Sequence, residues 1–134
     1  LVEGVKDGLI DVIVSDHLPE DEESKRLPFA QAATGAIGVE TLLSLSLEMY
    51  HNESLPLSKI IETLTINPAE ILKIKKGSLV KGSDGDICVF DLEAPWAVQA
   101  DKLKSKSKNT AIEGRKLQGK VLMTFLNGQL AFNQ

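Results

Sequence analysis

The sequence has 134 residues, a net charge of −4, 43% hydrophobic residues and 25% charged residues. This composition is typical of a soluble globular protein with one modest domain or parts of two, and the negative charge argues against nucleic acid or an anionic membrane as the main partner. No apolar run reaches membrane-spanning length, and we expect no signal peptide. The single cysteine excludes an internal disulfide and fits a reducing cytoplasm.

The first half of the chain predicts a strand, a loop and a helix. Residues 9–14 form a nearly continuous apolar run after the Asp7-Gly8 turn signal, which is typical of a strand buried on both faces of a parallel sheet. Residues 15–35 are rich in charge and turn formers and predict a long loop. Apolar residues at helical spacing then predict a helix over 38–51.

Two further helices are expected before the pattern changes. Ser58 is the expected N-cap of the first. Asn67 and Pro68 have the residue types of an N-cap and a first helical position, so they predict a short second helix. The lysines of 73–76 would lie in its last turn, where they suit the helix dipole, and Gly77 would end it.

The remainder of the chain predicts antiparallel β structure. Residues 86–92 alternate sufficiently for a strand. Residues 120–126 and 129–132 flank Asn127-Gly128, which supplies the positive φ angles of a type I′ hairpin turn. The chain therefore reads as strand, loop and helices first, and as a β region second.

Asp16 is the residue with the most chemical information. It follows directly after the predicted buried strand, and catalytic groups of β/α barrels lie at the carboxyl ends of strands. A carboxylate there could bind a metal ion or accept a proton from an activated water. The alternative is that Asp16 only caps the following turn, and spacing alone leaves both open.

Other reactive residue types are expected to be structural. His17 would point to the opposite face from Asp16 on an extended chain, so we expect it to be hydrogen-bonded rather than a shared metal ligand. His51 is expected to be an ordinary cation near a helix end, and the acidic run 20–23 a solvated loop without the pattern of a calcium site. The lysine-rich tract 102–108 is expected to be solvated, and Cys88 to pack within a strand.

Several motifs, taken in order, resemble the dihydroorotases, which are cyclic amidohydrolases of the amidohydrolase superfamily. SDHLP, a lysine a few residues later (Lys25) and PFAQAATGAIGVETLL resemble their last barrel strand and its loop. TINPAEILKI resembles their helical N-P-A segment, GSLVKGSDGDICVFDLEAPWAV their return to a β domain, and GKVLMTFLNGQLAF their terminal hairpin. The order and spacing of these motifs make the resemblance specific over nearly the whole chain.

The resemblance implies an α/β fold that is only partly present here. The family fold is a TIM-type (β/α)8 barrel with a small composite β-sandwich, and a barrel alone takes roughly 250 residues. Residues 1–76 would supply the last strand, loop and C-terminal helices of the barrel, and residues 77–134 the C-terminal part of the sandwich. The start at Leu1 rather than methionine fits a piece of a longer chain, inert on its own.

The resemblance also implies site residues. Asp16 matches the aspartate that touches the metal and handles the proton of the attacking water, so with the family context we favour its catalytic role. One or two zinc ions are implied, with most ligands outside this chain. The backbone of Ala33, Thr34 and Gly35 matches the loop that contacts the pyrimidine ring. Glu20 departs from the pattern, because dihydroorotases have there a histidine that helps bind the substrate carboxylate.

Three functions remain open on this basis. The first is a zinc-dependent dihydroorotase, which interconverts carbamoyl-aspartate and dihydroorotate in pyrimidine biosynthesis. The second is a hydantoinase or dihydropyrimidinase, whose substrate lacks the carboxylate that Glu20 would repel. The third is a silent homologue that serves as a structural partner of aspartate carbamoyltransferase. The expected partners are thus a small cyclic amide, and either a second copy or that transferase, with no nucleic acid or membrane.

Overall fold

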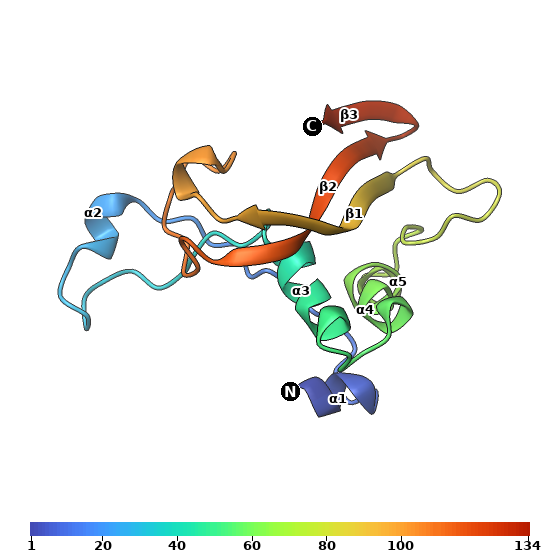
Figure 1. Cartoon of the computed structure of the whole chain (residues 1–134), viewed down its shortest axis with the longest axis horizontal. Coiled ribbons are helices and arrows are strands. Elements are labelled where there is room, and N and C mark those ends of the chain that lie inside the picture. The colour runs from blue at the N-terminus through green and yellow to red at the C-terminus, as the bar shows by residue number, and fades with distance from the viewer.

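A three-stranded antiparallel sheet with helices beside it makes up the fold (Figure 1). The structure, a computed structural model, describes residues 1–134. The elements are α1 (Val2–Lys6), α2 (Glu22–Lys25), α3 (Leu42–His51), α4 (Leu57–Leu64), α5 (Ile66–Ile71), β1 (Ile87–Ala97), a 3-10 turn (Ala100–Lys102), β2 (Lys116–Leu126) and β3 (Gln129–Asn133). None of the helices combines the length and apolar character needed to span a membrane.

The sheet confirms the predicted hairpin. Its strand order is β1-β2-β3, and both neighbouring pairs are antiparallel. Asn127 and Gly128 connect β2 to β3 with φ angles of 51° and 76°, as a type I′ turn requires. β1 and β2 both extend further than the sequence pattern predicts, and their pairing shifts register twice, between Val89 and Phe90 and between Asp91 and Pro95.

The predicted strand over residues 9–14 is wrong for this chain. The segment is extended but belongs to no sheet, because no other strand of the chain pairs with it. Its backbone is held instead by single contacts, such as the Ile13 amide donating to the Thr63 carbonyl over 3.2 Å. Leu9 and Val14 are 80% and 69% exposed, and the other apolar residues of the run are at most half-buried, so the expected burial on both faces is absent.

The three longer helices exist where they were expected, with different ends. α3 begins at Leu42 rather than near residue 38, and α4 begins after Pro56, so Ser58 is not its cap. Thr65, not Asn67, precedes α5. Asn67 lies inside α5, and its side-chain amide donates to the Asp11 carbonyl over 2.8 Å, so tertiary contact replaces the expected capping role.

The contact between α3 and β2 joins the helices to the sheet. Leu47 of α3 is completely buried and lies over Gly119 of β2, where an added Cβ would come within 2.4 Å of Leu47 Cδ1. The hydroxyl of Ser44 donates to the Gly119 carbonyl over 2.6 Å, and the indole N–H of Trp96 lies 3.1 Å from both of these oxygens. A glycine without a side chain therefore permits the close approach that these hydrogen bonds fix.

Little of the chain is buried despite this contact. Only 14 of the 134 residues are buried. The apolar core consists of two small clusters, with four and three buried residues. Large apolar side chains such as Phe29, Leu79 and Leu72 are 100%, 79% and 68% exposed. Surfaces of this kind commonly mark contacts with other protein.

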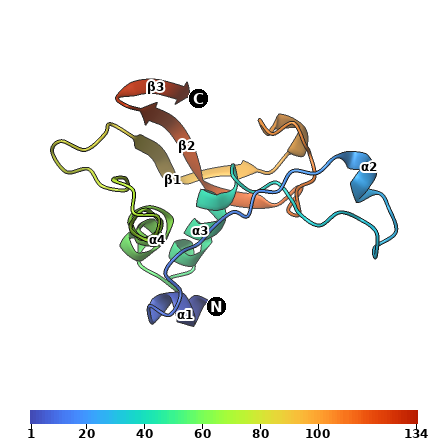
Figure 2. The same ribbon diagram turned by 180° about the vertical axis from the view of Figure 1, so that it is seen from behind.

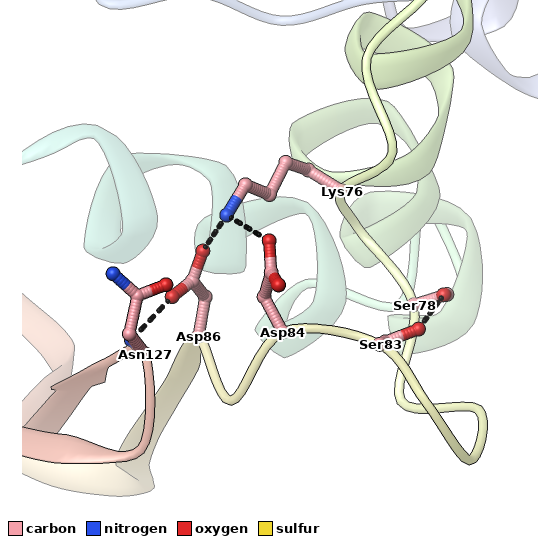
Figure 3. A network of polar contacts seen from close by, with 6 residues as sticks. All are labelled: Lys76, Ser78, Ser83, Asp84, Asp86 and Asn127. Carbon is pink, nitrogen blue, oxygen red and sulfur yellow. Dashed lines mark hydrogen bonds and ion pairs between the residues drawn. The ribbon is translucent and has the colours of Figure 1, made fainter.

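A charged network fixes the segment between α5 and β1 (Figure 3). The lysines after α5 are not helical as predicted, because α5 ends at Ile71 and Lys73 already has a φ of 55°. Instead, the Lys76 ammonium donates to Asp84 over 2.7 Å and to Asp86. The Asn127 amide of the hairpin turn also donates to Asp86, over 2.8 Å, so this carboxylate links the segment to the sheet.

The contacts of Asp86 in this network predict that the stability of the fold decreases at acidic pH. The Asn127 amide and the Lys76 ammonium hold the pKa of the Asp86 carboxyl below its usual value of 3.8. Because the folded pKa is lowered, the stabilisation is present above pH 3.8 and is lost as the pH falls through the lowered value. A carbon-13 NMR titration, assigned with Asp86→Asn, should place the Asp86 midpoint below 3.8, and Lys76→Met should raise it. A midpoint at or above 3.8 in the unsubstituted protein would contradict the contacts drawn in Figure 3.

Candidate active site

Asp16 lies at the edge of an open cavity of about 620 Å³. The cavity is bounded by the end of the extended segment, by Gly35 and Ala36, and by the face of α3 that carries Leu45 and Met49. Figure 2 shows the extended segment running from α1 past α3 towards α2. Asp16 is exposed, and its φ of 44° is left-handed, a conformation that aspartate tolerates better than most residues. Unusual backbone geometry of this kind is enriched at functional sites.

His17 is a structural residue, as expected. Its Nδ1 accepts hydrogen bonds from the backbone amides of Gly38 and Val39 over 3.0 and 3.3 Å. His17 also pairs with Ala36 in an isolated parallel bridge, in which the Leu18 amide donates to the Ala36 carbonyl over 3.0 Å. These contacts tie the backbone that follows Asp16 to the segment before α3, so they fix the position of Asp16 from one side.

The loop between Asp16 and α3 extends away from the rest of the molecule and carries α2 (Figure 1). The ammonium of Lys25 in α2 reaches back across it and donates to the carbonyls of Ala33 and Gly35 over 2.7 and 2.9 Å. Sequence reasoning noted this lysine but did not foresee that it holds the candidate substrate loop. The amides of Thr34 and Gly35 donate no hydrogen bond within the chain.

Glu20 is held through its backbone. Its carbonyl accepts from the Ser107 hydroxyl over 2.6 Å, and its amide lies 3.5 Å from the Asn109 side-chain oxygen. The neighbouring acidic residues are exposed as predicted, but Glu22 and Glu23 form the first turn of α2 rather than a loop. Asp21 caps α2 by accepting from the Ser24 amide over 2.7 Å, which lowers the pKa of its carboxyl, and Glu22 pairs with Arg26.

The chain on its own does not form a complete metal site. It brings together no group of three His, Cys, Asp or Glu side chains that could hold a metal ion. Asp16 nevertheless fits as a single ligand, because a carboxylate is an accepted zinc ligand and this one is exposed at the cavity edge.

Cys88 and His51 have surroundings that differ from those expected from the sequence. Cys88 lies in β1 but is exposed rather than packed as expected, and partial desolvation raises the pKa of its thiol, which disfavours the thiolate. His51 is the last residue of α3, but it is not a free surface cation. Its side chain is only 17% exposed, its Nε2 is buried without a hydrogen-bond partner, and its Nδ1 lies 4.0 Å from Glu93.

The lysine-rich tract is only partly solvated. Lys104 and Lys106 are exposed, but Ser105 and Ser107 between them are half-buried. The amides of Lys104 and Ser105 donate to the Glu40 carboxylate over 3.0 and 3.1 Å. The alternation of lysine and serine is the sequence signal for a segment with one docked side, and sequence reasoning missed it.

Comparison with known proteins decides the family. Residues 1–131 match the model of the amidohydrolase family. The chain belongs to the amidohydrolase family. It is 43% identical to the dihydroorotase of Ehrlichia chaffeensis over 98% of its length, and 42% identical to the dihydroorotase of a Wolbachia symbiont of Drosophila simulans over all of it. It spans about 30% of the length of these curated relatives.

Solved amidohydrolase structures share its fold. The L-hydantoinase (dihydropyrimidinase) of Arthrobacter aurescens matches 98% of this chain with a TM-score of 0.91 and 30% identity, and the match covers 31% of that protein. The dihydropyrimidinase of Brevibacillus agri matches with a TM-score of 0.93 over 98% of this chain and 30% of that protein. At 20% identity the second match shows the fold alone.

Proposed function

We propose that this chain is part of a longer protein, called the parent protein here, that hydrolyses a cyclic amide of the dihydroorotase type. The observation that carries this proposal is Asp16. It stands in left-handed backbone at the edge of a cavity, in a chain 43% identical to a dihydroorotase. The pathway would be pyrimidine biosynthesis in the cytoplasm.

The parent fold that we propose is a TIM-type barrel with a small β-sandwich. Residues 1–76 would complete the barrel, and residues 77–134 would form part of the sandwich. The exposed apolar residues of the extended segment, Leu9 and Val14, support this, because strands of the missing barrel would pair with and cover them. The parent could also form homo-oligomers or bind aspartate carbamoyltransferase.

The parent would hold one or two zinc ions, to which this chain contributes Asp16 as a single ligand. When bound, zinc supplies a Lewis acid that activates water and polarises an amide carbonyl. The Asp16 carboxylate is the group of this chain that moves a proton. It accepts the proton of the attacking water and delivers it to the ring nitrogen as the amide bond breaks.

The loop at residues 33–35 would orient the ring through its amides. The carbonyls of Ala33 and Gly35 are already occupied by the Lys25 ammonium. The amides of Thr34 and Gly35 remain without acceptors in the chain, so they are the donors available to a ring carbonyl. A ring with two carbonyl oxygens flanking its nitrogen suits such donors.

Glu20 is the observation that favours the second candidate, a hydantoinase or dihydropyrimidinase. A carboxylate facing the carboxylate of dihydroorotate is repelled by about 1 kcal/mol in water and by more in a drier site. A hydantoin has no carboxylate and avoids this cost.

The test of the proposed dihydroorotase activity is to supply the parent protein with zinc and compare hydrolysis of dihydroorotate, hydantoin and dihydrouracil. We expect dihydroorotate to have the highest kcat/KM; failure on all three would support the silent homologue.

Glu20→His tests whether this side chain faces the substrate. The change removes the repulsion and adds a possible cation, so we expect the KM for dihydroorotate to fall about tenfold, which corresponds to about 1.4 kcal/mol. The KM for hydantoin should not change. Glu23→His, in the exposed helix α2, is the matched control and should change neither value. An unaltered KM for dihydroorotate in Glu20→His would mean that Glu20 points away from the site.

A further inference from the structure

One short segment contacts both ends of the loop beside Asp16. The side-chain amide of Asn109 donates to the Gly35 carbonyl over 3.1 Å, and the Asn109 carbonyl accepts from the Ile37 amide over 3.1 Å. At the other end of the loop, the Glu20 backbone is held by Asn109 and Ser107. The side-chain contacts to Gly35 and Glu20 join positions separated by 74 to 89 residues in the sequence.

The contacts fix the loop geometry rather than add to the apolar core. The Gly35 carbonyl accepts from two donors, the Asn109 amide and the Lys25 ammonium, so the orientation of its peptide group is determined from both sides. Gly35 has a φ of 114°, and a Cβ there would come within 2.8 Å of Leu18. The Ser107 hydroxyl lies between the Glu20 carbonyl and the Asn109 side-chain oxygen and can donate to either.

We propose that Asn109 is a positioning residue that holds the 20–35 loop in its substrate-binding conformation. It fixes the peptide group between Gly35 and Ala36, which follows the Gly35 amide that would orient the ring, and the backbone at Glu20, whose side chain would affect substrate choice. It forms no hydrogen bond with Asp16, so we expect it to affect substrate binding rather than proton transfer. The expected change in KM rests on the proposed function. The expected change in loop structure follows from the hydrogen bonds alone.

The kinetic test compares Asn109→Ala with Glu40→Ala in the zinc-loaded parent protein. Asn109→Ala leaves the Gly35 carbonyl with one donor and the Glu20 amide without an acceptor, so we expect the KM to rise about tenfold while kcat changes less than about threefold. Glu40→Ala also releases the lysine-rich tract, at Lys104 and Ser105, but leaves the Asn109 contacts in place. It should leave KM and kcat close to those of the unsubstituted protein.

A second variant separates the hydrogen bond from general packing. Asn109→Asp is nearly the same size and keeps an oxygen towards Glu20, but it replaces the donor to Gly35 with an acceptor. It should raise the KM about tenfold, as expected for Asn109→Ala. It also provides the test if the alanine variant does not fold. A KM unchanged in Asn109→Asp, or raised equally in Glu40→Ala, would overturn the proposal.

Hydrogen exchange distinguishes failure of this inference from failure of the proposed function. The Glu20 amide should exchange faster in Asn109→Ala than in Glu40→Ala, because it loses the Asn109 side-chain oxygen as its acceptor. If the parent hydrolyses no cyclic amide, the proposed function fails, and this exchange pattern still decides whether Asn109 holds the loop. Equal exchange in Asn109→Ala and Glu40→Ala would overturn the inference even in an active enzyme.

Discussion

Replacing Asp16 with asparagine in the zinc-loaded parent protein is expected to lower kcat by about 100-fold or more. A positioned acid or base typically contributes a factor of that size, and an amide cannot take up the proton. Folding should be nearly unaffected, because Asp16 is exposed and asparagine tolerates its left-handed φ of 44° equally well. Steady-state turnover and circular dichroism on the same preparation would check both parts.

Asp11→Asn is the matched control for that change. Asp11 lies in the same extended segment, is also exposed, and contributes its backbone carbonyl rather than its side chain to the contact with Asn67. Removal of its charge should leave kcat within about twofold of the unsubstituted value, since surface substitutions away from a site have small effects. Turnover near the unsubstituted value in Asp16→Asn would remove the catalytic role that we assign to this residue.

Gly119→Ala is expected to destabilise the fold strongly, because Gly119 lies where β2 meets α3. Gly119 has a φ of 93°, which costs an alanine about 1–2 kcal/mol in the left-handed region. The new Cβ would also lie 2.4 Å from Leu47 Cδ1, and overpacking of a buried contact costs about 1–3 kcal/mol more. Denaturant unfolding of the parent protein should therefore show a loss of about 2–5 kcal/mol in unfolding free energy.

Gly114→Ala is the control that should lose only the backbone part of that unfolding free energy. Gly114 has a similar φ of 75°, but no atom lies within 4 Å of its added Cβ. It should lose only the backbone cost of about 1–2 kcal/mol, so the difference between the two variants measures the close approach of α3 to β2. Equal losses in both variants would show that the contact between Gly119 and Leu47 is looser than described.

Local sequence signals predicted the parts of the fold that local physics determines. The Asn127-Gly128 hairpin formed as expected, because its two positive φ angles need only these residues. The helix α3 followed from its apolar spacing. The strand over 9–14 failed because a strand depends on partners, and this chain supplies none beside it.

Long-range contacts explain what the sequence could not show. The capping role expected of Asn67 gave way to a hydrogen bond with Asp11, 56 residues earlier. The sequence made Asp16 a candidate through its position and the family resemblance, but it did not predict the left-handed backbone of this residue. Lys25 and Asn109 were not foreseen as supports of the 33–35 loop, since nothing in their local sequence indicates that both approach the Gly35 carbonyl.

The most direct test of the account is a crystal structure of the parent protein with zinc. The account predicts that an Asp16 carboxylate oxygen lies at bonding distance from a zinc ion, about 2.0–2.2 Å, with the 33–35 loop facing the same cavity. A zinc ion bound elsewhere, with the Asp16 carboxylate turned to solvent, would contradict it.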